Sequence, residues 1–390
     1  MRRATGILLI LLLILAAAAA HAEEGTDITS ACGLSGTGMN RDNLKRCTDR
    51  KYTTYSALGR GGTLTIDGKG KPLGGLFLQI YDRVTAFRVE ASPDGVSWTP
   101  CGEGTAHLTD WYPLPEGSVM ARVVNTDRAR LFLAELHVYS AGEKPEEAHA
   151  WVDLDKADLM LITCHPDDEL LWFGGLLPTY AGERDLAVQT VTVVPSIPQR
   201  RLELLDGLWH CGVEAYPAFL GMVDASTKSL SAQYKRWSKN NLYSKVTGVI
   251  RQYRPEVVVT HDLSGEYGHG GHRATADAVV HAVSLAANGS KYAASAKAWG
   301  VWQVKKCYVH LYEKGTIQLN WHVPLSAFGG RDGLEVATEA LAFHRSQTAH
   351  GWAMEDGGDM NNAVFGLYYS EVGPDLNKDD LMEGVQIKQE

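Results

Sequence analysis

From residue 159 onward, segments with the pattern of buried strands alternate with segments that have helical periodicity. The strand-like runs are short and apolar, and they span residues 159–163, 186–194, 256–260 and 307–311. The helical runs are longer, and they span residues 169–180, 200–211, 242–253, 272–286 and 336–346. Such alternation is typical of a mainly parallel sheet with helices on both faces. This part of the chain is therefore predicted to be an α/β domain.

The preceding part of the chain has a shorter, strand-like pattern. Its strand-like runs are separated by turn residues and span residues 62–66, 76–81, 86–90 and 131–139. Closely spaced short strands predict a β-sandwich. Residues 141–148 are polar and include Pro145, a composition typical of a linker. We therefore expect a small all-β sandwich domain at 23–140, a linker at 141–150 and the α/β domain at 151–390.

The first 22 residues have the pattern of a secretory signal peptide. Arg2 and Arg3 precede an apolar run over residues 7–20, and Ala20-His21-Ala22 has the small-x-small form of a cleavage site. The alternative is a membrane anchor, but the run is shorter than the ~20 residues that a span needs. We expect cleavage near Ala22, export to the cell envelope or beyond, and no transmembrane segment after cleavage.

The amino-acid composition of the chain restricts which binding partners and which disulfides are expected. The net charge of −9 and the pI of about 5.9 argue against nucleic acid, which needs a concentrated basic face. Six cysteines are compatible with disulfides in an exported protein. We first expect Cys32 to pair with Cys47, because both lie in the loop-rich leader to the first domain. Cys164, Cys211 and Cys307 have the apolar surroundings of buried thiols.

The segment His165-Pro166-Asp167-Asp168-Glu169 places one imidazole and three carboxylates between a predicted strand and a predicted helix. This junction lies at the carboxyl edge of the predicted sheet, where open α/β folds place their sites. Unpaired charges beside a buried strand are unfavourable. A bound metal ion would account for them.

A second segment, residues 260–275, follows another predicted strand and opens at the same edge of the sheet. His165 and Asp168 lie three residues apart at a helix start and can reach one ion, and this histidine-containing segment can supply a third ligand. Two histidines, one carboxylate and an open position are typical of a catalytic zinc site, in which bound water has a lowered pKa. Asp167 then lies beside the metal as a general base. The alternative is that Asp167 caps the helix.

Four sequence elements, matched in their order along the chain, resemble the LmbE-like, or PIG-L, family of N-acetylglucosaminyl deacetylases. They are the segment 165–169, the pair His269 and His272, the segment 200–204 followed by Cys211-Gly212-Val213, and the segment 344–347. The resemblance covers residues 157 to 350. It implies a Rossmann-like fold and an N-deacetylase that acts on a carbohydrate or glycoconjugate.

The resemblance also implies roles for individual residues. His165, Asp168 and His272 would be the ligands of zinc, and ferrous iron suits the same set. Asp167 would be the general base, which later passes its proton toward the leaving amine. His269 would stabilise the oxyanion of the tetrahedral intermediate or act as an acid.

Other matched positions would bind substrate or support the site. Arg200 would hold a hydroxyl or phosphate of the substrate, although it can equally pair with Glu203 on an exposed helix face. Asp224 would bind sugar hydroxyls. His344 is expected to be a lid or packing residue, and Glu169 is expected to support the helix start.

One position departs from the family pattern. Many members have an aspartate immediately before the last ligand, where it orients the other histidine, whereas this chain has Gly271. Asp262 and Glu266 are the acids that can take its place. We expect an exported zinc-dependent N-deacetylase, and the alternative is a glycan-binding surface protein with a catalytically impaired hydrolase domain.

Two segments of the first domain resemble a discoidin (coagulation factor 5/8 type C) module. They are residues 44–55 and 92–98, the latter with an Asp94-Gly95 turn signal before Trp98. The resemblance implies a glycan-binding module, and a sandwich that only makes the enzyme rigid is the alternative.

Overall fold

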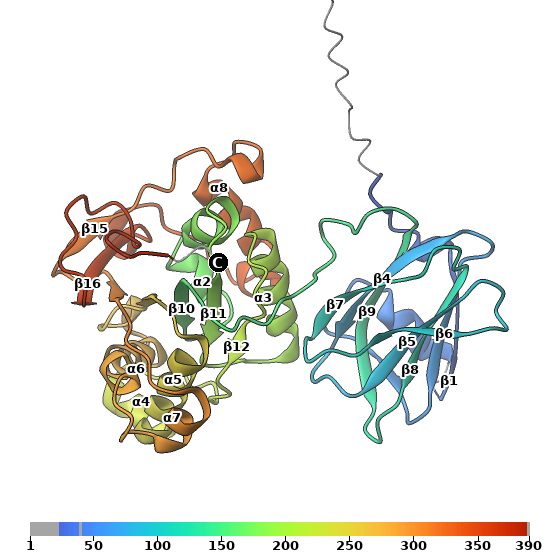
Figure 1. Cartoon of the computed structure of the whole chain (residues 1–390), viewed down its shortest axis with the longest axis horizontal. Helices are drawn as coiled ribbons and strands as arrows, with labels where there is room; N and C mark the ends of the chain where they lie inside the picture. The colour runs from blue at the N-terminus through green and yellow to red at the C-terminus, as the bar shows by residue number, and fades with distance from the viewer. Residues whose placement is uncertain (1–22, 39–40, 388–390) are drawn as a thin grey trace, which may run out of the picture.

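The computed structural model describes residues 23–38 and 41–387 (Figure 1). The expected signal peptide, residues 1–22, lies outside the described residues. Among the described residues, no helix is both long enough and apolar enough to cross a membrane.

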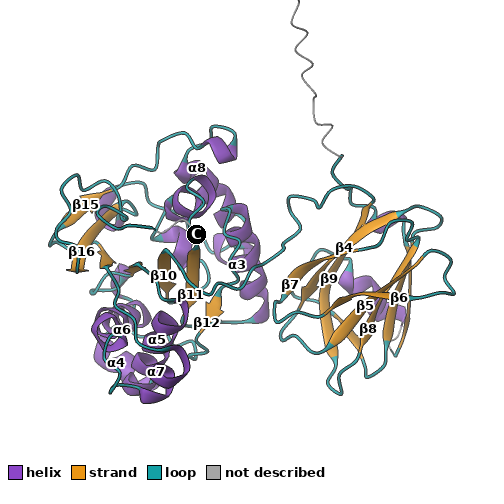
Figure 2. Cartoon of the chain, viewed as in Figure 1, coloured by secondary structure: helices purple, strands orange, loops and turns teal. Residues whose placement is uncertain are grey.

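The first part of the chain forms two antiparallel sheets (Figure 2). The five-stranded sheet has the order β1-β3-β8-β5-β6, with bounds Gly33–Thr37, Thr63–Asp67, Met120–Asn125, Phe87–Ser92 and Thr99–Glu103. The four-stranded sheet has the order β2-β9-β4-β7, with bounds Ser56–Leu58, Leu131–Ser140, Leu73–Ile80 and Thr109–Pro113. A short helix, α1 (Arg41–Leu44), precedes β2.

Burial along the strands explains this arrangement. In β8 the buried residues alternate with half-buried ones, as expected for a strand with one face on a core. In β4 almost every residue is buried, because Leu76 and Leu78 belong to the large core while Phe77, on the opposite face, packs with Tyr139 and Ala148. This sheet is therefore covered on both faces, and its second face is turned toward the linker.

The second part of the chain contains a seven-stranded sheet of order β12-β11-β10-β13-β14-β16-β15. Its strands are Ala218–Phe219, Val188–Thr192, Leu159–Thr163, Val257–Thr260, Lys306–His310, Val364–Ser370 and Thr316–Gln318. The pairs from β12 to β14 are parallel, and β16 and β15 are joined to them by antiparallel pairs. The predicted mainly parallel α/β architecture is thus confirmed.

Helices cover both faces of this sheet (Figure 1). They are α2 (Asp168–Leu171), α3 (Pro198–His210), α4 (Leu230–Arg236), α5 (Lys239–Tyr253), α6 (Gly270–Ala286), α7 (Ala293–Trp299), α8 (Gly333–Leu341) and α9 (Arg345–Thr348). Successive residues of β10 point to opposite faces: Leu161 packs in the core that includes α3 and α8, and Ile162 packs in the core that includes α5 and α6. A strand with two helix-covered faces must be apolar throughout, and all of β10 is buried.

Two predicted helices are shorter in the structure. The helix expected over 169–180 ends at Leu171, and after Gly174, which has φ of 50°, the chain forms a π-helical turn at Pro178–Glu183. A Cβ at Gly174 would lie 2.6 Å from Asn362 Oδ1, so close packing there requires glycine. The helix expected over 336–346 is divided into α8 and α9.

The expected pairing of Cys32 with Cys47 is wrong. All six cysteines lie in the described residues, and all six are free thiols. Cys47 is buried, and its Sγ donates to the carbonyl oxygen of Leu44, whereas Cys32 is half-buried. Burial raises the pKa of Cys47 to about 11, so this thiol is protonated and behaves as a small apolar side chain.

Candidate active site

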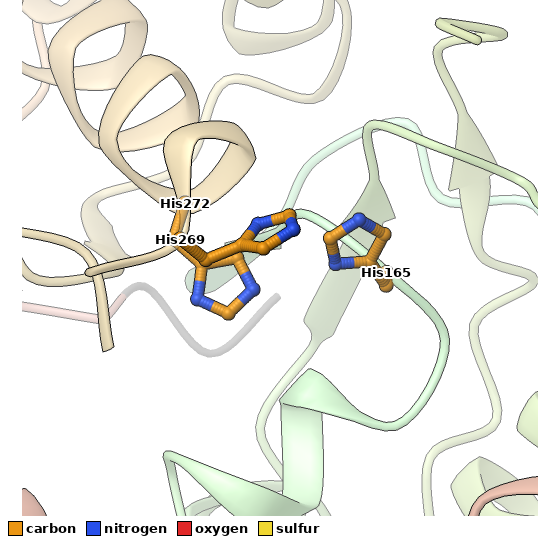
Figure 3. A group of neighbouring side chains, drawn as sticks. All are labelled: His165, His269 and His272. Carbon is orange, nitrogen blue, oxygen red and sulfur yellow. The ribbon is translucent and has the colours of Figure 1, made fainter. Parts of the chain in front are cut away.

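The residues of the two predicted segments meet at the carboxyl edge of the parallel strands. His165, Asp167 and Asp168 lie in the turn between β10 and α2, and His269 and His272 lie at the start of α6, which follows β13. Figure 3 shows the rings of His269 and His272 next to the ring of His165. Their centroids lie 5.0 Å and 5.4 Å from that of His165. The structure therefore brings the predicted histidines together.

Asp168 occupies the centre of this group. Its carboxylate is buried and accepts hydrogen bonds from the backbone N–H of His165 at 2.6 Å and from Trp172 Nε1 at 2.9 Å. The carboxylate also lies 3.3 Å from His165 Nδ1 and 3.4 Å from His272 Nε2. Burial alone would raise the pKa of Asp168, but the neighbouring histidines hold it well below its usual range. Asp168 is thus a buried anionic oxygen group that lies near imidazole nitrogens of His165, His261 and His272, and it is a candidate metal ligand.

His272 has one ring nitrogen that makes no hydrogen bond within the described part of the chain, although Asp168 lies 3.4 Å from it. Its Nδ1 donates to Glu266 Oε2 at 2.8 Å, so the ring is fixed by a carboxylate. Its Nε2 is buried and has no hydrogen-bond partner among the described residues. A buried nitrogen without a partner is unfavourable, and metal-ligating histidines commonly donate their other N–H to a carboxylate. With the carboxylate of Asp168 at 3.4 Å, His272 is therefore a candidate ligand for a divalent metal ion that prefers nitrogen and oxygen ligands.

Among the described residues, each group whose possible ligand atoms lie within 4.8 Å of one another contains two of the three residues His165, Asp168 and His272, and none contains all three. Atoms of His165, His269 and His272 lie within 4.8 Å of one another, as do those of Asp168, His261 and His272. His261 is less suited to bind a metal, because its Nε2 already accepts the backbone N–H of Cys164 at 2.9 Å and its Nδ1 donates to Glu266.

Glu266 holds three histidines in place, a role that the sequence did not reveal. Oε2 accepts hydrogen bonds from Nδ1 of His261 and of His272, each at 2.8 Å. Oε1 accepts one from His310 Nδ1 at 2.8 Å and one from the backbone N–H of Asp262 at 3.1 Å. Burial opposes the charge of Glu266, but the histidines hold its pKa well below its usual range. Glu266 is therefore a buried anion that fixes the ring of one candidate ligand.

Asp167 lies beside the candidate ligands in a strained backbone conformation. It has φ of 115° and ψ of −28°, a region that costs a non-glycine residue about 1–3 kcal/mol. Its side chain makes no helix-capping hydrogen bond within the described part of the chain. Instead, Oδ1 accepts a hydrogen bond from Arg200 Nη2 at 2.7 Å. Burial and the nearby Asp168 raise the pKa of Asp167 to about 8, and Arg200 opposes the shift. Such a carboxyl can both accept and donate a proton near neutral pH.

Glu169 and His344 support the backbone of Asp167. Glu169 Oε2 accepts the N–H of Asp167 at 2.8 Å, and Oε1 accepts a hydrogen bond from His344 Nε2 at 2.7 Å. Both side chains are buried. Burial lowers the pKa of His344, but Glu169 outweighs this effect and raises it. These contacts give Glu169 and His344 a positioning role.

His269 has no acidic partner in the structure. Among the described residues, neither Asp262 nor Glu266 bonds to it: Asp262 accepts the N–H of Ser264, and the Nδ1 of His269 has no hydrogen-bond partner. A Cβ at Gly271 would lie 3.1 Å from that Nδ1 and 2.8 Å from Cys164 Sγ. Burial, with His272 and His165 nearby, lowers the pKa of His269 to about 3. His269 is therefore a neutral imidazole.

A small cavity of about 150 Å³ opens onto these groups, and aromatic side chains form part of its wall. Its lining residues are His165, Asp167, Asp168, Leu171, Trp172, Arg200, Asp224, Tyr267, His269, Gln347 and Trp352. Arg200 and Asp224 thus share the cavity with the catalytic candidates. Arg200 pairs with Asp167, while Glu203 accepts hydrogen bonds from Gln199 and Ser346.

Tyr267 and Trp352 are cavity residues that the sequence did not single out. Their ring centroids are 5.2 Å apart, and the side chains are 41% and 37% exposed. The position of Tyr267 between Gly265 and Gly268, in the segment that supplies His269 and His272, was the sequence feature that could have identified it as a site residue. Trp352 is one of several tryptophans that could stack on a sugar ring, and nothing in the sequence distinguishes it from the others.

Comparison with known proteins finds similarity within the α/β part of the chain. Residues 160–283 match the model of the PIG-L family, described as GlcNAc-PI de-N-acetylase. A 1D-myo-inositol 2-acetamido-2-deoxy-alpha-D-glucopyranoside deacetylase from Frankia casuarinae is 27% identical over 180 residues, which are 38% of this chain and 57% of that protein. The enzyme of that name from Rhodococcus erythropolis is 29% identical over 206 residues, or 43% of this chain and 68% of that protein. The chain therefore spans about three-fifths of the length of these relatives.

A solved structure shows a weaker likeness. The N,N'-diacetylchitobiose deacetylase from Pyrococcus horikoshii is 17% identical, with a TM-score of 0.38 over 49% of this chain and 71% of that one.

Proposed function

We propose that this protein is an exported, metal-dependent hydrolase that removes the N-acetyl group from an N-acetylglucosamine-type sugar or glycan. The match to the PIG-L family model and the two deacetylase relatives support the reaction class. The observation that carries the proposal is the buried, unpaired Nε2 of His272, which faces the carboxylate of Asp168.

His165, Asp168 and His272 would hold zinc, or ferrous iron. When bound, such an ion lowers the pKa of water and polarises the acyl oxygen. The buried carboxylate of Glu266 would keep Nδ1 of His272 protonated and leave its Nε2 free to bind the ion.

Asp167 would move the proton in the reaction. Its carboxylate would accept a proton from the attacking water and return it to the amide nitrogen, and burial, which raises its pKa, favours this uptake of a proton. The C–N bond then breaks, and acetate and the amine of the sugar are released. The hydrogen bonds from Arg200 to Oδ1 and from Asp167 N–H to Glu169 hold this carboxylate toward the cavity.

His269 would act as a neutral hydrogen-bond donor. A neutral imidazole carries one N–H, which can stabilise negative charge that develops on the acyl oxygen. Its low pKa disfavours the alternative role as a general acid. Asp224 and Arg200 would bind hydroxyls of the sugar, and the exposed faces of Tyr267 and Trp352 would pack against its ring.

The first domain and the N-terminal segment suit a glycan outside the cell. We propose that residues 1–22 direct export and that the two antiparallel sheets form a discoidin-like module that brings glycan to the enzyme. A pulldown with insoluble chitin and with peptidoglycan tests this role. It compares the native chain with variants in which surface loops of these sheets are changed.

The activity is tested by measuring acetate released from chitooligosaccharides, simple N-acetylhexosamines and peptidoglycan fragments. Purified protein is loaded with zinc and compared with an Asp167→Asn variant. Release by the native protein above the level of the variant on any substrate supports the proposal.

A second candidate is a glycan-binding protein with an impaired hydrolase domain. The missing partner of His269 favours it, because Gly271 leaves that imidazole unoriented. If the native protein binds one of these glycans but releases no more acetate than Asp167→Asn does, the second candidate replaces the first.

A further inference from the structure

A large cavity lies where the linker and the two parts of the chain meet. Its volume is about 930 Å³, and its wall includes Phe77 of β4, Lys144 of the linker, Trp209 of α3 and Phe343. Among the described residues, it shares no lining residue with the small cavity at the candidate metal ligands. Small-molecule sites have volumes of roughly 300–1,000 Å³ and are frequent at domain interfaces.

The floor of this cavity is a buried hydrogen-bonded network. Asp206 accepts hydrogen bonds from Tyr52 Oη and from Gln79 Nε2, and it lies 3.5 Å from His149 Nε2. Gln79 is 1% exposed, and its Oε1 has no hydrogen-bond partner among the described residues. Burial raises the pKa of Asp206 to about 7. The floor thus offers hydrogen-bond donors and acceptors that come from both parts of the chain.

The ring of Trp209 forms part of the cavity wall, and the ammonium group of Lys144 lies next to it. Lys144 Nζ lies 4.9 Å from the centroid of the Trp209 ring. The indole is half-buried and fixed, because its Nε1 donates to the carbonyl oxygen of Glu146 at 2.6 Å and its ring packs 5.3 Å from that of Trp151. An aromatic face of this kind can pack against the C–H face of a sugar or attract an ammonium group.

The charges around the cavity exclude an anionic ligand. Its exposed lining acids are Glu146, Glu147, Asp185 and Glu214, whereas its lining Lys and Arg residues are Lys144 and Arg331. The lysine is committed to the linker, since its Nζ donates to the carbonyl oxygens of Pro145 and Ala148. A ligand here meets an excess of negative charge.

We infer that this cavity is a second ligand site, which binds a saccharide that carries no negative charge, either neutral or amine-bearing. Hydroxyls would bond to the Gln79–Asp206 floor, and one sugar face would pack on Trp209. The choice of a saccharide rests on the proposed function. The presence of the cavity does not rest on the proposed function, because its lining residues are not those of the candidate active site.

Helix α3 connects the two sites. Arg200 lies near its start and contacts Asp167, and Trp209 lies nine residues later at its end. At 1.5 Å per residue this separation is about 13 Å. The sugar unit in the cavity is therefore distinct from the sugar unit whose amide would be cleaved.

Binding is measured by titration calorimetry with the zinc-loaded Asp167→Asn variant, which prevents turnover. The ligands are a tetramer of N-acetylglucosamine, a tetramer of glucosamine and a tetramer of galacturonic acid. We expect the first or second to bind and the third not to bind. Adding Trp209→Ala should weaken binding at least 10-fold, and adding Trp299→Ala, an exposed tryptophan of α7, should leave it unchanged.

A second variant, changed only at the surface, keeps the inference testable if Trp209→Ala does not fold. Glu146→Lys with Glu214→Lys changes only exposed side chains and should weaken binding of the glucosamine tetramer at least threefold. Binding that is lost in Trp352→Ala but unchanged in both cavity variants overturns the inference, and so does binding of the galacturonate tetramer alone or of no tetramer. Acetate release by the native protein is scored separately, so either proposal can fail while the other stands.

Discussion

Replacing Glu266 with glutamine tests whether one buried carboxylate organises the candidate metal site. Each oxygen of Glu266 accepts two hydrogen bonds, Oε2 from His261 and His272 and Oε1 from His310 and the N–H of Asp262. Glutamine has the same shape but only one oxygen. Whichever way its amide is turned, the NH2 group faces two donors.

The destabilisation expected for Glu266→Gln follows from the number of donors that lose their acceptor. Each buried donor that loses its acceptor destabilises the protein by about 1–3 kcal/mol, so two donors give about 2–6 kcal/mol. If the amide faces His272, that ring loses the acceptor that fixes its tautomer, and its Nε2 is no longer held free for a metal. Loss of such a supporting contact typically lowers metal affinity about 10- to 100-fold.

The assay is zinc affinity by competition with a chromophoric chelator, with thermal unfolding of the metal-free protein measured in parallel. Glu203→Gln is the matched control, because Glu203 is equally buried and accepts hydrogen bonds from Gln199 and Ser346. The control should lose stability and keep its zinc affinity, whereas Glu266→Gln should lose both. Native zinc affinity together with native thermal stability in Glu266→Gln would refute the reasoning.

Three further predictions concern other parts of the molecule. Asp167→Asn should lower acetate release about 10²- to 10⁴-fold and leave zinc content, measured by mass spectrometry, unchanged; a smaller loss contradicts its role as base. His272→Ala should lower zinc content below half of the native value, while His281→Ala, an exposed histidine on the same helix, should not. Because burial raises the pKa of Asp206 from 3.8 to about 7, its contribution to stability is present below about pH 3.8 and is lost as the pH rises through 7. Relative to Asp206→Asn, the native protein should therefore lose up to about 4 kcal/mol between pH 4 and pH 8, and parallel melting curves over this range would contradict that.

Much of the α/β fold was predictable because its strands are buried on both faces. The run 159–163 coincides with β10, and the run 256–260 differs from β13 by one residue. Strands such as β12 and β15 were not predicted, since they have two and three residues and lie at the edges of the sheet. α2 ends before Gly174, whose close approach to Asn362 is a contact between distant parts of the chain that no local pattern reveals.

The candidate site was predictable where a motif and a sheet edge coincide. His165 and Asp168 follow β10, and His272 follows β13, so the parallel pairing of these strands brings the three together. The contacts of Glu266 were not predictable in the same way. One of its partners, His310, ends β14, and only the strand order β10-β13-β14 places that residue beside the others.

The glycine at position 271 affects which residue of this site can accept and donate a proton. With an acid at that position, a histidine at 269 would be held in one tautomer and its protonated form would be stabilised. Here Nδ1 of His269 has no hydrogen-bond partner among the described residues, and burial lowers the pKa of His269 to about 3, so the ring is a neutral imidazole and not an imidazolium acid near neutral pH. The raised pKa of Asp167, by contrast, leaves both of its protonation states available there. In the proposed reaction, proton transfer to the leaving amine would therefore depend on Asp167, and His269 would supply only the hydrogen bond that a neutral imidazole can give.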